Sequence, residues 1–241
     1  MERIDDLAIN NLKIIQNTDW FCYGTDAVLL SNFAHIIPGE TAVDFCSGNG
    51  IIPILLSAKS KAKKIIGVEI QPECVSLAKR SIELNNLSDK VEFVCADIKN
   101  ITEVFSAESV ASVTCNPPYM NGEWGFISPT DIKAVARHEI LMNLDDLMKA
   151  SSYILKFGGY FNMVHRAERL CDIFCAMRKY NIEPKRVLFV HSKVDKAPKL
   201  VLIEGMKGAK PSMKIMDPLC IYDDEGNFSE QYNDFVKGKE K

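Results

Sequence analysis

The chain has 241 residues, of which 47% are hydrophobic and 25% are charged, and its formal net charge at pH 7 is −3. These values are typical of a soluble globular protein, and the length suits one large domain or two small ones. No apolar run approaches the roughly 18 residues of a membrane span, and the start MERIDDLAIN is polar where a signal peptide is basic and then apolar, so we expect one domain in the cytosol without a membrane anchor.

Apolar runs of strand length alternate with amphipathic stretches of helix length along the chain. The expected strands are TAVDF (41–45), KIIGVEI (64–70), VEFVCAD (91–97), VASVTCN (110–116), GGYFNMV (158–164), RVLFVHS (186–192) and KLVLIEG (199–205). The expected helices lie near 51–60, 72–87, 143–157 and 166–180. In the second of these, Pro72 suits a first helical turn, and Val75, Ala78 and Ile82 form an apolar stripe behind it.

The repeated order of strand, helix and strand predicts a parallel sheet with helices on both faces. The last two strands are joined by KVDKAP (193–198), which is too short for a parallel crossover, so they must form an antiparallel hairpin. We therefore predict an α/β, Rossmann-like fold with a seven-stranded, mostly parallel sheet and an antiparallel last strand. This arrangement resembles that of the class I methyltransferases.

The first strand runs into a glycine-containing loop, DFCSGNG (44–50). In a doubly wound sheet, ligands bind at the carboxyl ends of the strands, so this loop is a candidate binding element. Gly48 and Gly50 let the backbone approach a ligand and turn tightly into the next helix. Cys46 departs from the usual glycine pattern, and similar turns occur in many nucleotide-binding folds.

Acidic residues follow the second and third strands. Glu69 can accept hydrogen bonds from both hydroxyls of an adenosine ribose, or it can cap a helix. Asp97, with the neighbouring apolar Ile98, can hold an adenine by its amino group and by packing, or it can serve as a turn or cap residue.

The fourth strand ends in Asn116-Pro117-Pro118-Tyr119. The two prolines fix the backbone angle φ at both positions and have no N–H, so the backbone there offers carbonyl acceptors and no donors. The Asn116 side-chain oxygen and the Pro117 carbonyl can then accept both hydrogens of a planar amino group, while Tyr119 offers a flat face for stacking. This turn favours methylation of an exocyclic amine, although a rigid loop after a strand would look similar.

Together with the loop at 44–50 and Glu69, this turn resembles the amino-methyltransferases that use S-adenosylmethionine (SAM). Three flanking motifs, FCYGTDAVLL (21–30), ARHE (136–139) and VHRAERL (164–170), are similar to those of bacterial tRNA adenine-N6-methyltransferases, which modify the adenine next to the anticodon of a valine tRNA. The resemblance runs from about residue 5 to residue 225.

The resemblance implies roles for individual residues. The donor would be bound by Thr25, Asp26, Asp44, Ser47, Gly48, Gly50, Glu69, Ile70, Asp97, Ile98 and Asn116. The target base would be handled by Asn116, Pro117 and Tyr119. Arg137, His138, His165 and Arg166 could contact RNA on the rim, although both histidines could instead be structural. Residues 1–40 would close the cofactor pocket, 41–225 would form the core, and 226–241 would form a polar tail.

Charge and cysteine usage bear on partners. Residues 156–214 contain 13 Lys and Arg against 5 Asp and Glu. This excess of positive charge is either an ordinary solvated surface or a footprint for RNA, with Lys193, Lys196 and Lys199 as candidate contacts.

The eight cysteines include no C-x-x-C pair, so they are interpreted as small buried thiols in a reducing compartment. Although Cys171 and Cys175 are four residues apart, we expect no metal, and we expect a monomer.

Three alternatives remain open from the residues. A protein-glutamine methyltransferase uses the same Asn-Pro-Pro-Tyr turn, but usually carries a sizeable helical domain before the first strand. A DNA adenine methyltransferase would need a recognition domain for which the chain has no room. A non-catalytic RNA-binding protein on the same fold would show a broken donor loop or a replaced Asn116, and neither is seen.

Overall fold

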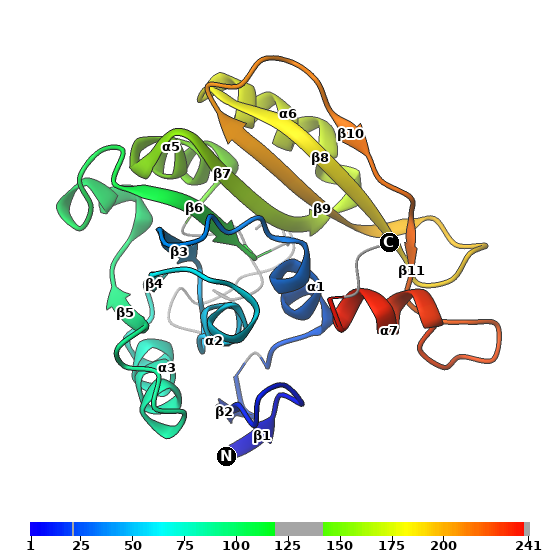
Figure 1. The fold of residues 1–241 in the computed structure, drawn as a ribbon, viewed down its shortest axis with the longest axis horizontal. Helices are drawn as coiled ribbons and strands as arrows, with labels where there is room; N and C mark the ends of the chain where they lie inside the picture. Colours follow the sequence, from blue (N-terminus) through cyan, green and yellow to red (C-terminus); the bar gives the residue numbers. More distant parts are fainter. Residues whose placement is uncertain (21, 119–141, 239–241) are drawn as a thin grey trace, which may run out of the picture.

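A computed structural model describes residues 1–20, 22–118 and 142–238 (Figure 1). Its strands are β1 (Glu2–Asp6), β2 (Lys13–Asn17), β3 (Thr41–Phe45), β4 (Lys64–Glu69), β5 (Val91–Cys95), β6 (Val110–Cys115), β7 (Leu155–Arg166), β8 (Ile182–His191), β9 (Pro198–Lys207), β10 (Lys214–Ile215) and β11 (Leu219–Cys220). Its helices are α1 (Thr25–Phe33), α2 (Ile51–Lys59), α3 (Pro72–Leu84), α5 (Leu144–Ile154), α6 (Leu170–Lys179) and α7 (Glu230–Val236), with 3-10 turns η1 (Ile98–Glu103) and η2 (Ala167–Arg169).

The central sheet has the strand order β10-β8-β9-β7-β6-β3-β4-β5, and β11 also pairs with β8. The neighbours β5, β4, β3, β6 and β7 are parallel, whereas β9 is antiparallel to both β7 and β8. The predicted α/β fold, with seven strands and an antiparallel last one, is therefore confirmed. The sequence did not predict β10 and β11, which are two residues each and too short to show a periodicity.

Helices cover both faces of this sheet (Figure 1). One core lies between the sheet and α1, α2 and α3, and the other lies between the sheet and η1, α5 and α6. Strand residues divide between them in alternation, so that Ala42 belongs to the first core and Val43 to the second. As expected, Pro72 begins α3 and its stripe of Val75, Ala78 and Ile82 is buried.

Several predicted boundaries are wrong by three or four residues: β8 begins at Ile182 and not at 186, and α6 begins at Leu170 and not at 166. The helix expected over 143–157 ends at Ile154, because Leu155 is extended and already pairs with Val110 of β6. The strand expected to begin at residue 158 therefore begins three residues earlier. The start of α5 is fixed by a capping box, in which Asn143 and Asp146 each accept a hydrogen bond from the other's backbone N–H.

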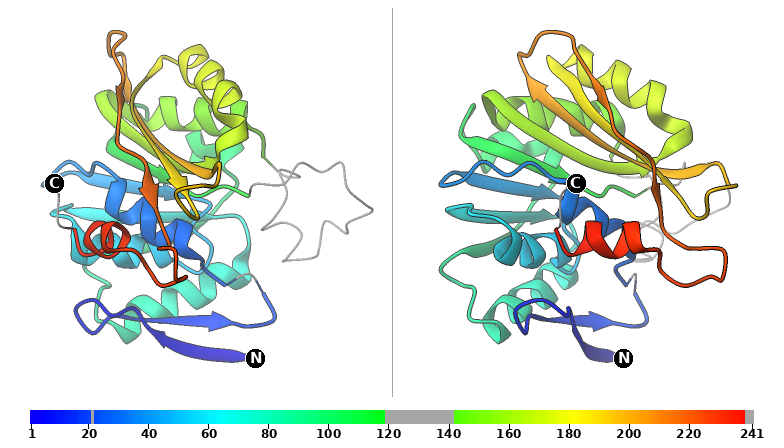
Figure 2. Two further views of the ribbon diagram at one scale, coloured as in Figure 1. Left: turned by 90° about the vertical axis from the view of Figure 1, so that its right-hand side faces the viewer. Right: turned by 45° about the vertical axis from the view of Figure 1, so that its right-hand side comes forward.

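The N-terminal region contains a β-hairpin that no sequence pattern indicated. β1 and β2 pair with each other outside the main sheet, and β2 docks on α3. The Ile15 N–H donates to Ser81 Oγ at 3.0 Å, and the Lys13 N–H donates to Asn85 Oδ1 at 2.8 Å. Figure 2 shows the hairpin beside α3. Residues 1–40 thus include folded structure anchored to the core.

The C-terminal region contains one short helix in addition to its polar residues. Within 226–238, α7 packs against α1, and Tyr232 is buried (Figure 2). Ser229 caps this helix by accepting a hydrogen bond from the Tyr232 N–H at 3.0 Å.

The cysteines depart from expectation in part. Cys74 and Cys115 are buried, but Cys95, Cys171 and Cys175 are exposed. Among the described residues, no group of His, Cys, Asp and Glu could hold a metal ion. No helix in the described ranges is long and apolar enough to cross a membrane.

The hairpin offers a test of its place in the fold. Ile14 is fully buried and Ile4 is 58% exposed, although both are isoleucines of the same hairpin. We expect Ile14→Ala to lower the free energy of unfolding by about 2 to 5 kcal/mol, and Ile4→Ala to change it by less than about 0.5 kcal/mol. Urea denaturation measures both, and equal effects would contradict the docking of β2 on the core.

Candidate active site

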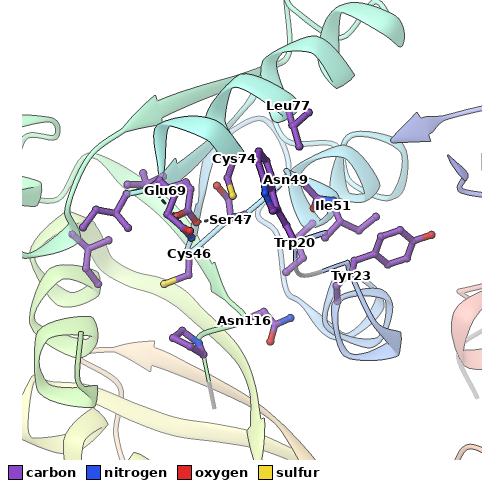
Figure 3. A pocket seen from close by; sticks show the side chains of 18 of the residues that line it. Trp20, Tyr23, Cys46, Ser47, Asn49, Ile51, Glu69, Cys74, Leu77 and Asn116 are labelled. Atoms are coloured by element: carbon purple, nitrogen blue, oxygen red, sulfur yellow. Dashed lines mark hydrogen bonds between the residues drawn. The ribbon is translucent and has the colours of Figure 1, made fainter. Parts of the chain in front are cut away.

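A cavity opens at the carboxyl ends of β3, β4 and β6 (Figure 3). Its walls come from the N-terminal segment, the loop after β3, the end of β4 with the start of α3, the turn after β5, and the turn after β6. The lining residues are Asn17, Trp20, Tyr23, Ala27, Cys46, Ser47, Gly48, Asn49, Ile51, Ile52, Val68, Glu69, Ile70, Gln71, Cys74, Leu77, Ala96, Asp97, Ile98, Asn116, Pro118 and Met142. Most of the strand-end residues that the sequence singled out therefore share one cavity, whereas Asp44, Gly50 and Pro117 do not line it.

The loop after β3 needs its glycines for two different reasons. Gly50 has φ +88°, and a Cβ there would lie 2.5 Å from Phe93 Cζ, so Gly50 permits close packing. Gly48 has φ +54°, but a Cβ there would meet nothing within 4 Å. Gly48 lines the cavity, so its missing side chain leaves room for a ligand to reach the backbone. Cys46 adopts a positive φ of 56° at the position where a glycine is usual.

Glu69 is held rigidly at the end of β4. Its Oε2 accepts a hydrogen bond from the Gly48 N–H at 2.9 Å, and its Oε1 accepts from the Gln71 N–H at 3.0 Å and from Gln71 Nε2 at 3.2 Å. The residue is only 5% exposed. Its carboxylate is therefore fixed in the cavity wall, with lone pairs left over for a ligand's hydroxyl groups.

Asp44 lies beneath the loop as a fully buried carboxyl. Thr114 Oγ1 donates to its Oδ1 at 2.6 Å, while its Oδ2 has no hydrogen-bond partner among the described residues. Burial raises the pKa of Asp44 well above its usual value, and the nearby Glu69 carboxylate raises it further. Asp44 is fully buried and does not line the cavity, so it supports the loop from below and is not itself exposed to a ligand.

Two lining residues also present buried polar atoms that lack a partner in the part of the chain described. These are Ser47 Oγ and Gln71 Oε1. Buried polar groups are normally hydrogen-bonded, so their presence around a cavity indicates a ligand with several polar groups. These polar atoms of the cavity wall fit SAM, whose ribose, ammonium and carboxylate groups can form hydrogen bonds with them.

Asp97, in the turn after β5, both caps a helix and lines the cavity. Its Oδ1 accepts from the Lys99 N–H at 2.9 Å and caps η1, so the cap interpretation is correct. Asp97 nevertheless lines the cavity with Ile70 and Ile98. These two isoleucines supply the apolar surface that a planar ring needs for packing.

Asn116 and Pro118 line the cavity directly after β6, whereas Pro117 is buried and is not part of the lining. Figure 3 shows Asn116 across the pocket from Ser47. Tyr119, Arg137 and His138 lie outside the described residues.

Some of the expected residues lie elsewhere. Thr25 and Asp26 begin α1, and the Asp26 carboxylate accepts from the Ala27 N–H at 2.8 Å. Ala27 lines the cavity but the two preceding residues do not. His165 was expected on the rim, yet it is fully buried, because it lies inside β7 and pairs with Val201 of β9. Arg166, the last residue of β7, is exposed.

The expected lysine contacts lie at the same edge of the sheet as Asn116. β8 runs parallel to β6 and β7, because β9 is antiparallel to both β7 and β8, so the β8–β9 loop leaves the sheet at its carboxyl edge. Lys193 Nζ donates to the Asp224 carbonyl at 3.1 Å, Lys196 Nζ lies 3.0 Å from Asp195, and Lys199 is exposed.

The sequence missed several lining residues. Trp20 and Tyr23 come from the N-terminal segment, and Gln71, Cys74 and Leu77 come from the start of α3. The position of Gln71, two residues after Glu69, could have indicated the last group. Nothing local could have indicated Trp20, because it reaches the cavity only through the docking of the hairpin.

Comparisons with known sequences agree with this site. The family described as the TRM5/TYW2 methyltransferase domain matches residues 32–120. The tRNA1(Val) (adenine(37)-N6)-methyltransferase of Shewanella halifaxensis is 26% identical over 77% of this chain and 76% of its own length. The protein of the same name from Photobacterium profundum is 24% identical, over 86% of each chain. The resemblance predicted from the sequence motifs is confirmed.

Solved structures share the fold. A predicted O-methyltransferase from Agrobacterium tumefaciens superposes with a TM-score of 0.72 at 20% identity, covering 89% of this chain and 96% of that one. A geranyl diphosphate methyltransferase in complex with SAM gives a TM-score of 0.55 at 15% identity, over 76% of this chain and 84% of that one. The chain therefore has the class I methyltransferase fold.

Asp44 offers a test of the buried charge. Because burial raises its pKa in the folded state, the folded protein keeps a proton that the unfolded chain releases near pH 4. Stability should thus fall as pH rises from about 4 through the raised pKa of Asp44. Asp44→Asn removes this loss, so we expect the variant to be more stable than the wild type by about 1 kcal/mol or more at pH 8, with the difference shrinking toward pH 4.

Urea denaturation at several pH values measures this difference. The control is Asp89→Asn, which removes the same charge from an exposed position and should change the unfolding free energy by less than about 0.5 kcal/mol at every pH. A wild type that is as stable as Asp44→Asn at pH 8 would contradict the cost assigned to the buried carboxyl.

Proposed function

We propose that this chain transfers a methyl group from SAM to N6 of the adenine next to the anticodon in a tRNA. Its class I methyltransferase fold and its resemblance to the tRNA1(Val) (adenine(37)-N6)-methyltransferases support this proposal. The observation that carries the proposal is that Asn116 and Pro118 of the amino-methylation turn line the same cavity as the glycine loop and Glu69. Methyl donor and acceptor amine would therefore meet between β3 and β6. We further propose that the enzyme acts in the cytosol, where tRNA is found.

The donor would be held by the cavity walls. Glu69, fixed by Gly48 and Gln71, would accept hydrogen bonds from the ribose hydroxyls, and Ile70 and Ile98 would pack on the adenine ring. Asp44, which is buried beneath the glycine loop and does not line the cavity, would support that loop through its bond with Thr114. When bound, SAM supplies an electrophilic methyl group on a sulfonium.

Asn116 and Pro117 would bind and orient the acceptor. The side-chain oxygen of Asn116 would accept one hydrogen of the amino group. The carbonyl of Pro117, which itself does not line the described cavity, would accept the other, and the two bonds would direct the nitrogen lone pair toward the donor. No general base is required for attack, and the extra proton leaves after transfer. Tyr119, the next residue but one, would stack on the base.

The RNA would lie along the carboxyl edge of the sheet. We use the name lysines of the β8–β9 loop for Lys193 and Lys196 in the loop together with Lys199 at the start of β9. They lie at that edge with the exposed Arg166, within a stretch of 13 basic and 5 acidic residues over 156–214. An anticodon loop presents unpaired bases, so turning one adenine into the cavity costs less than extracting it from a duplex.

The direct test uses purified protein, labelled SAM, and total tRNA from a strain deleted for this gene. We expect N6-methyladenosine in the digested tRNA. We expect Asn116→Ala to lower kcat more than about 100-fold, because an aligned acceptor is lost, while SAM binding in calorimetry stays within a few-fold. The proposal is wrong if Asn116→Ala keeps more than about a tenth of the activity. Methylation of a glutamine-bearing peptide in place of tRNA would contradict the substrate but keep the chemistry.

The lysines of the β8–β9 loop offer a separate test of the RNA surface. We expect Lys193→Glu, Lys196→Glu and Lys199→Glu together to weaken tRNA binding and to flatten its salt dependence, by about 0.7 in the log–log slope for each phosphate that a lysine no longer neutralises. Fluorescence anisotropy at several salt concentrations measures both quantities.

A matched control reverses the same number of charges at the opposite edge of the sheet. Lys61 and Lys63 precede β4, and Lys210 follows β9; all three are exposed. Their replacement by Glu should leave the salt slope almost unchanged. If both triple variants reduce the slope equally, the β8–β9 loop has no special role in RNA binding.

A further inference from the structure

Gln16 is a polar side chain buried in the N-terminal hairpin. It follows the buried Ile14 and Ile15 in β2 and is only 2% exposed. Neither the glycine loop nor the amino-methylation turn includes it, and it does not line the cavity. A buried amide must satisfy its hydrogen-bonding groups within the protein, so the partners of Gln16 show what it connects.

These partners belong to three separate segments. Gln16 Nε2 donates to the Asp5 carboxylate in β1. Gln16 Oε1 accepts from the Tyr23 N–H at 3.0 Å and from Asn49 Nδ2 at 3.3 Å. One side chain thus joins the hairpin, the segment before α1 and the glycine loop after β3.

Two of the three partners stand on the cavity wall. Asn49 lies between Gly48 and Gly50, and Tyr23 comes from the N-terminal side; both line the cavity. In Figure 3, Trp20, Tyr23 and Asn49 lie on the side of the pocket opposite Glu69. We call Asn17, Trp20 and Tyr23 the cavity cover.

The hairpin that carries Gln16 is itself fixed to the core. Ile15, the preceding residue, donates its N–H to Ser81 Oγ of α3, and Ser81 is fully buried. Gln16 is therefore a rigid support, and its Oε1 sets where the Tyr23 backbone and the Asn49 side chain can lie. Removing Oε1 would leave both donors without this acceptor.

We propose that Gln16 is a positioning residue, which couples the cavity cover to the glycine loop and so preorganises the cofactor cavity. The identity of the cofactor rests on the proposed function, whereas the coupling itself does not. Gln16 touches neither donor nor acceptor, so its loss should weaken SAM binding and leave the methyl-transfer step unchanged once SAM is saturating.

The first test uses Gln16→Leu, which keeps the volume and removes the amide. Without cofactor, we expect the Tyr23 amide to exchange hydrogen at least about tenfold faster, because its acceptor is gone. In calorimetry we expect the Kd for SAM to rise about tenfold. With tRNA, the KM for SAM should rise similarly and kcat should stay within about twofold.

Two further variants separate coupling from general stability. Ser81→Ala removes one bond between the hairpin and α3 but leaves the bonds between Lys13 and Asn85 in place, so it should alter the Kd for SAM less than threefold. Asp5→Asn combined with Gln16→Glu exchanges the amide and the carboxylate between the two positions. The carboxylate at position 16 would still accept from Tyr23 and Asn49, and the amide at position 5 would donate to it. This double variant should recover most of the SAM affinity.

The outcomes are distinguishable. Unchanged exchange of the Tyr23 amide in Gln16→Leu, or an equal loss of SAM affinity in Ser81→Ala, would overturn the positioning role. A wild-type protein that binds no SAM would overturn the proposed function, while the hydrogen-exchange comparison would still decide the coupling.

Discussion

The site depends on one carboxylate held between two backbone amides. Glu69 accepts from the Gly48 N–H and from the Gln71 N–H, which fixes the loop after β3 relative to the start of α3. Parallel pairing of β3 and β4 brings their carboxyl ends together, but pairing alone leaves loops free to adopt many conformations. The hydrogen bonds to Glu69 remove that freedom before any ligand arrives, so the ligand does not have to order the loop.

The same arrangement stores an electrostatic cost in the folded protein. Asp44 and Glu69 are both buried, and the Glu69 carboxylate disfavours ionisation of Asp44 because like charges repel. Of the two, only Asp44 has an oxygen without a hydrogen-bond partner in the described chain. A hydrophobic residue at position 44 would pack at a lower cost in free energy. The carboxyl at position 44 therefore lowers the stability of the folded protein beneath the glycine loop.

The sequence predicted what depends on local pattern and missed what depends on distant contacts. Strands with near-continuous apolar runs were found, and with them the residues just past each strand, such as Glu69, Asp97 and Asn116. The β1–β2 hairpin was missed because its anchor, the bond from Ile15 to Ser81, joins residues 66 apart. His165 was misplaced because burial at that position follows from pairing with β9, which hydrophobicity within β7 does not reveal.

The acidic and basic groups at the carboxyl edge of the sheet differ in how deeply they are buried. The buried carboxylates of Asp44 and Glu69 lie within the sheet ends, whereas the lysines of the β8–β9 loop lie at the surface. Because water screens the lysines more strongly than the buried groups, their attraction for phosphate depends on salt, while the field inside the cavity does so far less. If the proposed function holds, substitutions among these lysines would alter RNA binding without altering the cavity. Asn116, directly after β6, lies in the cavity lining and at the same edge of the sheet as these lysines, which is the arrangement that the proposed transfer to an RNA base requires.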